Sequence, residues 1–234
     1  MRKIKTFFRM VGSYAPSNFL RILLLKIGGT KIGKNVKISF GTIVKKNVYI
    51  GDSVHIEKNV FIGSNTLIGN HVKIESDAFL YRTEIGEHTV IHKGAVLYGN
   101  DKDRLKVGRY CFIGFYALLD GSDKLEIGDF VHIAGPAVGI FTHSSIKNCI
   151  YGNQPYTEKY DKYQIKRPVT IANNVWIGGK VTIYPGVHVS SHSAILPNSV
   201  VDRDIRPNTM VGGIPAEFKK NIEIIDDEVV FKRG

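Results

Sequence analysis

The sequence has few cysteines: among its 234 residues only Cys111 and Cys149 occur, and they stand far apart. Two isolated thiols provide neither the paired spacing of a zinc site nor the several bridges of a disulfide-rich secreted domain. We therefore expect no metal centre and a reducing, cytoplasmic setting.

Long apolar runs are also missing. The run FLRILLL at residues 19–25 is too short to cross a bilayer and includes Arg21. No cleavable signal peptide is evident. The formal net charge is +11, and its basic residues are spread through the chain without a recognisable nucleic-acid-binding module. We expect anionic partners such as phosphate groups or a membrane surface, and no nucleic acid.

What the sequence does have is a six-residue repeat. An aliphatic residue recurs at every sixth position, and the fifth place of each hexad is small or β-branched. The aliphatic series is Ile32, Ile38, Val44, Ile50, Ile56, Ile62, Ile68 and Ile74, and it returns at Ile171, Ile177, Ile183, Val189, Ile195 and Val201. A fixed internal period of this kind indicates a repeat architecture.

The period can be read physically. Six is a multiple of the strand period of two, so the aliphatic residue and the fifth-place residue of a hexad point to the same side. Corners between hexads need residues that tolerate positive φ, and glycine and asparagine do so best. Asparagines in suitable places are Asn35, Asn47, Asn59, Asn65, Asn173 and Asn174. The sequence thus predicts short strands joined by tight corners.

Three hexads make one triangular coil of about 18 residues, so the aliphatic side chains should stack in three columns. The predicted columns are Ile32 with Ile50 and Ile68, Ile38 with Ile56 and Ile74, and Val44 with Ile62 and Leu80. Each buried isoleucine contributes roughly 1.5–3 kcal/mol. The pattern predicts an all-β parallel β-helix, and a sandwich or barrel is the alternative, for which hairpin turn signals are largely missing. The period alone does not give the handedness.

Residues 1–30 break the repeat and predict an amphipathic helical cap. The apolar positions of its first helix are Ile4, Phe7, Phe8 and Val11. Ser17 can cap a second helix over residues 18–27, which would end at Gly28. Two interpretations remain open, namely a cover for the first coil and a basic amphipathic element that touches the inner face of an anionic membrane.

The largest interruption of the repeat is the segment at about 143–168, which predicts a protruding loop. It is polar and rich in tyrosine, with Tyr151, Tyr156, Tyr160 and Tyr163. Loops on a rigid scaffold commonly carry binding groups, although such a loop can also be merely mobile. We expect the β-helix to occupy residues 31–216, followed by a C-terminal tail at 217–234.

Three motifs in the second half of the chain carry a family resemblance. They are Val-Trp-Ile-Gly at 175–178, Pro-Gly-Val at 185–187 and Gly-Ile-Pro-Ala at 213–216. With the hexads, they make the sequence similar to the hexapeptide-repeat acyltransferases, in particular the maltose, galactoside and surface-polysaccharide O-acetyltransferases. The resemblance implies a left-handed β-helix, acetyl-CoA as co-substrate, and a homotrimer with active sites between subunits.

The resemblance also implies roles for individual residues. His143, just ahead of the long loop, stands where the family places its catalytic histidine, which acts as a general base. Asp120 would orient His143 or the acceptor, a role that a backbone carbonyl can also fill. Trp176 would flank the thioester arm of the cofactor or contact another subunit. The other candidate cofactor-binding residues are Gly178, Gly179, Pro197, Arg203, Lys219 and Lys220, of which the three cations would meet phosphates.

The function predicted in this way is acetyl transfer to a hydroxyl of a sugar or oligosaccharide in surface polysaccharide or lipopolysaccharide biosynthesis. The main alternative is a nucleotide-sugar N-acetyltransferase of the same fold, because an acceptor amine also needs a base. A carbonic anhydrase would require three histidines around zinc. Its candidate ligands are the pairs His88 with His92 and His188 with His192. Two further alternatives are a non-catalytic β-helix scaffold and an acyltransferase that uses Cys149 as the acyl nucleophile.

Overall fold

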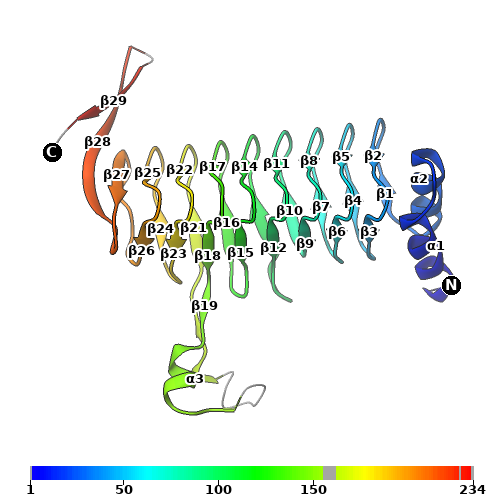
Figure 1. The fold of residues 1–234 in the computed structure, drawn as a ribbon, viewed down its shortest axis with the longest axis horizontal. Helices are drawn as coiled ribbons and strands as arrows, with labels where there is room; N and C mark the ends of the chain where they lie inside the picture. Colours follow the sequence, from blue (N-terminus) through cyan, green and yellow to red (C-terminus); the bar gives the residue numbers. More distant parts are fainter. Residues whose placement is uncertain (1, 155–161, 227, 233–234) are drawn as a thin grey trace.

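A computed structural model describes residues 2–154, 162–226 and 228–232 of the chain. Short parallel strands wind through three sheets and form a long prism, with helices at its N-terminal end and a hairpin at its C-terminal end (Figure 1). This architecture is a left-handed parallel β-helix, as the resemblance implied. The prism is the frame on which all candidate site residues are placed.

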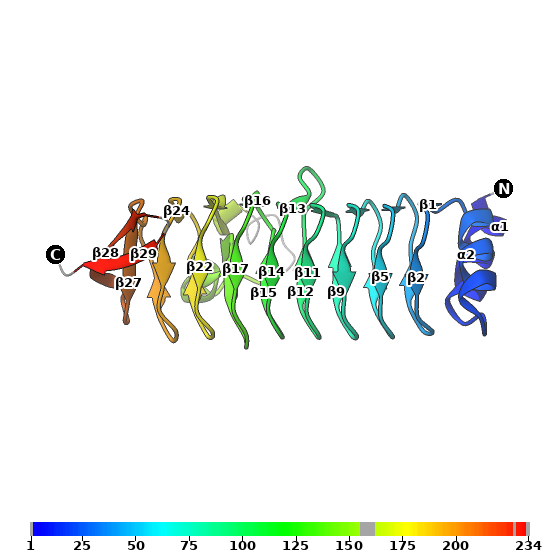
Figure 2. The same cartoon turned by 90° about the horizontal axis from the view of Figure 1, so that it is seen from above.

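The chain visits the three sheets, here named A, B and C, in that order in each coil (Figure 2). Sheet A contains β1 (Lys31–Ile32), β4 (Tyr49–Ile50), β7 (Leu67–Ile68), β10 (Thr83–Ile85), β13 (Leu105–Val107), β16 (Leu125–Ile127), β21 (Val169–Ile171) and β24 (His188–Val189). Sheet C contains β3 (Ile43–Val44), β6 (Phe61–Ile62), β9 (Phe79–Tyr81), β12 (Val96–Tyr98), β15 (Leu118–Asp120), β18 (Gly139–Phe141), β23 (Thr182–Ile183) and β26 (Val200–Val201).

Sheet B continues into the C-terminal hairpin. Its parallel strands are β2 (Lys37–Ile38), β5 (His55–Ile56), β8 (Lys73–Ile74), β11 (Val90–Ile91), β14 (Phe112–Ile113), β17 (His132–Ile133), β22 (Trp176–Ile177), β25 (Ala194–Ile195) and β27 (Thr209–Gly212). The antiparallel strands β28 (Glu217–Ile225) and β29 (Glu228–Lys232) follow. The described part of the expected tail is therefore a hairpin.

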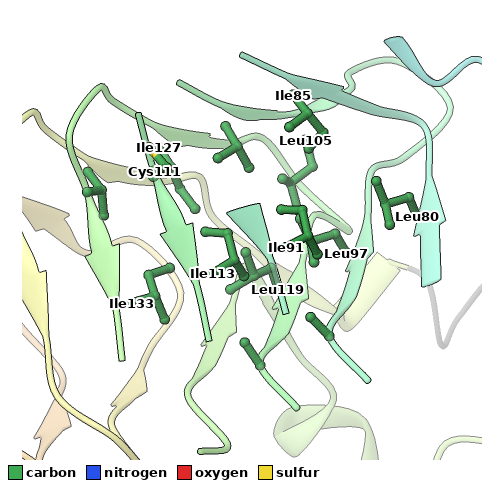
Figure 3. Close-up of a cluster of buried hydrophobic side chains, with 14 of the residues drawn as sticks. Leu80, Ile85, Ile91, Leu97, Leu105, Cys111, Ile113, Leu119, Ile127 and Ile133 are labelled. Atoms are coloured by element: carbon green, nitrogen blue, oxygen red, sulfur yellow. The ribbon is translucent and has the colours of Figure 1, made fainter. Parts of the chain in front are cut away.

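The predicted aliphatic columns are confirmed in register. Ile32 pairs with Ile50 and Ile50 with Ile68 in sheet A, and the other two columns pair in the same way in sheets B and C. The column residues after the first coil are almost fully buried, and the fifth-place residues lie beside them in the core. Figure 3 shows how these side chains fill the interior of the middle coils.

The corners follow the predicted chemistry in part. Asn35, Asn47, Asn59, Asn65 and Asn174 have positive φ. Asn173 does not; its side chain instead accepts a hydrogen bond from the backbone N–H of Asp129 at 2.8 Å. Left-handed backbone costs a side-chain-bearing residue about 1–2 kcal/mol.

Four corner positions between sheets A and B carry rings at positive φ, contrary to the simple expectation of asparagine or glycine. They are His71, His88, Tyr110 and Phe130. Neighbouring rings stack with centroids 4.7–5.0 Å apart and interplanar angles of 8° or less. Such ring pairs contribute about 0.5–1.5 kcal/mol each, which offsets the cost of the backbone conformation.

The two predicted helices are present. They are α1 (Arg2–Ser13) and α2 (Asn18–Ile27), and the Ser17 hydroxyl caps α2 by accepting from Leu20 N at 3.2 Å. Leu25 and the Arg21 guanidinium are buried toward the first coil, and Arg21 donates to the Ile38 carbonyl at 2.6 Å. In the described part of the chain, no helix combines the length and the apolar character needed to cross a bilayer.

An arm leaves the prism at the predicted position (Figure 1). It begins with β19 (His143–Ser144), continues through α3 (Ile146–Ile150), and returns through β20 (Ile165–Lys166), which pairs antiparallel with β19. Tyr156 and Tyr160 of the predicted loop lie outside the described residues. The arm thus starts and ends as a short two-stranded ribbon at one corner of the prism.

Candidate active site

The corner between sheets C and A brings Asp120 and His143 together. Asp120 is the last residue of β15, and it pairs in register with Phe141, the last residue of β18 in the next coil. Thr142 follows and is fully buried; its hydroxyl donates to the Asp120 carbonyl at 2.8 Å. The pairing of His143 with Lys166 then fixes the first residue of the arm.

Asp120 and His143 form a hydrogen-bonded pair. Nδ1 of His143 contacts Oδ2 of Asp120, while Oδ1 of Asp120 accepts from Ser122 N at 2.8 Å. The Asp120 side chain is 1% exposed and that of His143 is 30% exposed. A carboxylate on Nδ1 assigns the imidazole proton to that nitrogen, so Nε2 carries the lone pair. A partly exposed imidazole held in this tautomer is suited to accept a proton.

A third group, Tyr98, belongs to this corner and was missed by sequence reasoning. It is the last residue of β12 and pairs in register with Asp120. Burial, followed by the charge of the Asp120 carboxylate and a hydrogen bond to it, raises the pKa of Tyr98 to about 12. Tyr98 is therefore a neutral phenol near pH 7, able to donate to the carboxylate that contacts His143. The polar segment at 99–104 interrupts the hexads, so the pairing of Tyr98 with Asp120 could not be predicted from the period.

Trp176 lies on a different side of the prism. It is in β22 of sheet B, between His132 and Ala194 of the neighbouring coils, and it is 39% exposed. In a triangular coil, sheet B faces away from the corner between sheets C and A. Within one chain, the prism therefore separates Trp176 from His143.

An apolar groove of about 380 Å³ runs between sheet B and the C-terminal hairpin. Its apolar lining consists of Trp176, Ala194, Ile222, Ile224, Val229 and Phe231. The hairpin residues were not among the sequence candidates, because an assigned tail gives no reason to expect that its side chains return toward sheet B. Trp176 therefore forms part of the wall of a groove.

Gly178, Gly179 and Pro197 lie at the corner between sheets B and C, where successive coils touch. A Cβ on Gly178 would stand 2.6 Å from the nitrogen of Pro197, and one on Gly179 would stand 2.5 Å from the carbonyl oxygen of Gly135. Real Cβ atoms do not approach so closely, so both glycines are needed for the coils to pack. This corner, too, is separate from His143 within one chain.

The three candidate cations lie at the C-terminal end of the prism. Arg203 donates to the neighbouring Asp202 at 3.0 Å and lines a cleft of about 320 Å³ together with Arg206. Lys219 and Lys220 are on β28, where Lys220 pairs with Met210 of β27. The sequence candidates therefore fall into three groups: the pair at the arm, the sheet B surface with its corner, and this C-terminal end.

The histidine pairs considered for zinc do not converge. His88 is part of the ring stack at the corner between sheets A and B, whereas Nδ1 of His92 contacts Glu75 at 3.0 Å at another corner. His188 contacts Thr170 on sheet A, while His192 lies beside Asn174. Among the described residues, no three His, Cys, Asp or Glu side chains are grouped so that they can hold a metal ion.

Comparison with known proteins places this chain in a family. The model of the hexapeptide repeat of succinyl-transferase matches residues 53–80. A chloramphenicol acetyltransferase from Escherichia coli is 30% identical over 150 residues, which cover 53% of this chain and 71% of that protein. The chain belongs to the hexapeptide-repeat acetyltransferases.

The other similarities of this hexapeptide-repeat acetyltransferase agree with that assignment. Galactoside O-acetyltransferase of Escherichia coli (strain K12) is 31% identical over 128 residues, which cover 55% of this chain and 59% of that enzyme. The UDP-N-acetylglucosamine acyltransferase from Campylobacter jejuni has the same fold, with a TM-score of 0.66 at 20% identity, covering 82% of this chain and 71% of that chain. The chain thus spans somewhat more than half of the length of the galactoside enzyme.

Proposed function

We propose that this protein is an acetyl-CoA-dependent O-acetyltransferase that acts on a hydroxyl of a sugar. The observation that carries the proposal is the hydrogen-bonded pair of Asp120 and His143 at the mouth of the arm. A thioester is already activated, so the protein has to supply mainly a positioned base for the acceptor hydroxyl. The membership of the chain in the hexapeptide-repeat acetyltransferases supports the choice of acetyl-CoA as co-substrate.

The proposed chemistry is a direct transfer. Nε2 of His143 takes the proton of the acceptor hydroxyl while the hydroxyl oxygen forms a bond to the acetyl carbonyl carbon. The carbon–sulfur bond then breaks, and the protonated His143 returns the proton to the departing thiolate. The buried Asp120 carboxylate holds the ring and stabilises the imidazolium that exists between the two proton transfers.

We infer that the complete site is shared between subunits of a homotrimer. Trp176 and its apolar groove lie on the side of the prism away from His143, so one chain alone cannot surround both reactants. A ring of three subunits uses two different surfaces of each copy at every contact. Such a ring can place the sheet B surface of one subunit against the corner between sheets C and A of the next subunit, where the arm begins. We call this corner the arm corner.

In this arrangement the sheet B surface receives the cofactor. Trp176 and the apolar groove suit its uncharged arm, and Arg203, Lys219 and Lys220 offer cations for its phosphates. Gly178, Gly179 and Pro197 keep the neighbouring corner narrow, with backbone groups close to the surface. We also propose a reducing, cytoplasmic location, which the low cysteine content of the sequence led us to expect.

The test of the function is an assay of thiol release from acetyl-CoA with a panel of acceptors. The panel should contain free sugars, nucleotide sugars, amino sugars and surface-type oligosaccharides, with product masses measured in parallel. The proposal expects thiol release that depends on a hydroxyl acceptor and a stoichiometric acetyl ester. Transfer only to the amine of a nucleotide sugar would favour the N-acetyltransferase alternative instead. If no acceptor in the panel caused thiol release, the proposal would be contradicted.

A further inference from the structure

The net charge of the protein is concentrated at one end, although its basic residues are spread through the chain. Residues 1–51 contain eleven Lys and Arg and no Asp or Glu. The remaining 183 residues contain 21 of each sign, so the formal excess of +11 equals that of residues 1–51. These residues form α1, α2 and the first strands of the prism.

Eight of these cations are exposed lysines. Arg9 and Arg21 are structural, because Arg9 donates to the Gly28 carbonyl at 2.5 Å and Arg21 is buried against the first coil. The lysines of the segment are Lys3, Lys5, Lys26, Lys31, Lys34, Lys37, Lys45 and Lys46. All eight are exposed, and none of them forms an ion pair with a carboxylate among the residues that the structure describes.

The same end exposes a large apolar surface. On α1, the exposed residues Ile4, Phe7 and Met10 recur every three positions. On α2, Phe19, Leu23 and Ile27 recur every four positions, and Phe19 is 77% exposed. These spacings put each set on one side of its helix. We name these six residues the apolar face. Figures 1 and 2 show both helices lying across the end of the prism.

A cleft adjoins the apolar face. It has a volume of about 350 Å³ and lies between α1 and β3. Met10 and Tyr14 contribute apolar surface to it, whereas Arg9 and Lys45 contribute cations. An apolar wall with cations at its edge matches the chemistry of a lipid molecule, whose phosphate is joined to hydrocarbon chains.

We propose that this end of the prism docks on the surface of an anionic lipid bilayer. The apolar face enters the boundary between head groups and acyl chains, and the surrounding lysines meet the head-group phosphates. Each lysine near an anionic surface adds a favourable electrostatic contribution to binding, and the apolar side chains add to this through burial. The proposal rests on charge and exposure alone and is independent of the acetyl-transfer activity.

Other occupants fit this end less well. A second copy of the chain would bring two strongly cationic surfaces together, which opposes association. A nucleic acid would satisfy the lysines but would leave the aliphatic side chains of Ile4, Leu23 and Ile27 without a matching surface. A bilayer satisfies both kinds of residue. Docked in this way, the prism keeps β18 and the arm about five strand spacings, or roughly 24 Å, beyond β3.

The test is flotation of the full-length protein with vesicles. Vesicles of phosphatidylcholine alone are compared with vesicles in which phosphatidylglycerol replaces part of that lipid. The proposal expects binding to the anionic vesicles that is at least about tenfold tighter than to the neutral ones and that weakens as salt is added. Equal binding to both kinds of vesicle, or no binding to either, would overturn it.

Two variants separate the two contributions. Phe19→Gln with Leu23→Gln removes apolar surface, and Lys3→Glu with Lys5→Glu reverses charge; all four positions are exposed, so the fold should be retained. Each double variant should bind the anionic vesicles about tenfold more weakly. The matched control, Lys102→Glu with Lys147→Glu on exposed sites elsewhere, should bind as the parent protein does.

Three results would contradict the proposal. One is vesicle binding by both double variants that equals that of the parent protein. Another is binding to duplex DNA that is tighter than binding to the anionic vesicles, which would favour nucleic acid. The third is self-association that Phe19→Gln with Leu23→Gln abolishes, without vesicle binding by the parent protein. Sedimentation velocity and the melting temperature check that each variant keeps the assembly and fold of the parent.

Discussion

The buried carboxylate of Asp120 accepts a hydrogen bond from Nδ1 of His143, 23 positions later in the chain. The two residues meet because β15 and β18 are successive strands of sheet C that both end at the same corner. One strand ends on the carboxylate, and the other leads directly into the arm that begins with the histidine. This relationship holds an imidazole in place where the repeat breaks, and it is the basis for proposing His143 as the base.

Asp120→Asn should lower kcat by roughly 10²–10⁴-fold, because an amide neither fixes the same tautomer nor stabilises the imidazolium. The apparent KM for acetyl-CoA should change little, because the Asp120 side chain is buried behind His143 and is not available to contact the cofactor. Steady-state kinetics with both substrates varied will separate the two parameters. A large rise in this KM at unchanged kcat would show that Asp120 acts on cofactor binding instead.

Tyr98→Phe tests the phenol that donates to Asp120. The raised pKa of Tyr98 means that the neutral phenol is favoured in the fold, so its contribution to stability is complete below about pH 10 and is lost as the pH rises toward 12. The stability advantage of the parent over Tyr98→Phe should therefore be constant from pH 7 to about 9 and shrink above pH 10. Urea midpoints at each pH measure this, and a difference that stays the same above pH 10 would exclude the assigned interaction.

Mixed trimers test the shared site. His143→Ala removes the base, and Trp176→Glu places a charge on the sheet B surface, so each variant alone should be nearly inactive. If the two variants are co-expressed in equal amounts, about a quarter of the sites should combine an intact arm corner with an intact sheet B surface. The co-expressed population, which includes both inactive homotrimers, should regain about that share of the parent activity, and mixed trimers separated from the homotrimers should regain about a third. A mixture no more active than the separate variants would indicate that each site lies within one chain.

Gly178→Ala tests the contact between coils beside Trp176. The new Cβ would meet the backbone nitrogen of Pro197 at 2.6 Å, and because backbone cannot move aside easily, the variant should lose about 1–3 kcal/mol of stability. Gly139→Ala is the matched control, since its Cβ would meet the ring of Phe141 at 2.7 Å, and a ring can rotate. Urea unfolding should rank Gly178→Ala as clearly less stable than Gly139→Ala, and equal losses would show that the corner is not constrained as described.

The repeat predicted which core residues pair with one another, because burying the aliphatic side chains leaves the strands little freedom to shift. Ile38, Ile56 and Ile74 stack as expected, since a shift by one residue would turn every aliphatic side chain outward. The second helix was equally predictable, because Ser17 and Gly28 carry the local chemistry of a helix start and a helix end.

The site was less predictable, because it depends on corners where the period fails. The pairing of Tyr98 with Asp120 depends on the length of the excursion at 99–104, which the six-residue period does not predict. The motif that contains Trp176 lies in the sequence soon after the arm, yet the triangular coil turns it away from His143. Sequence distance was a poor guide there, since the direction of a side chain depends on which sheet its strand joins.

The most direct test of direct acetyl transfer with His143 as the base is the kcat of His143→Ala in the acetyl-CoA thiol-release assay with a saturating hydroxyl acceptor. We expect a loss of roughly 10²–10⁴-fold, with the oligomeric state and melting temperature unchanged. Loss of a positioned base slows proton removal without disturbing the prism, because His143 is the first residue of the arm and not part of the core. Turnover equal to that of the parent protein would contradict the assignment of His143 as the base.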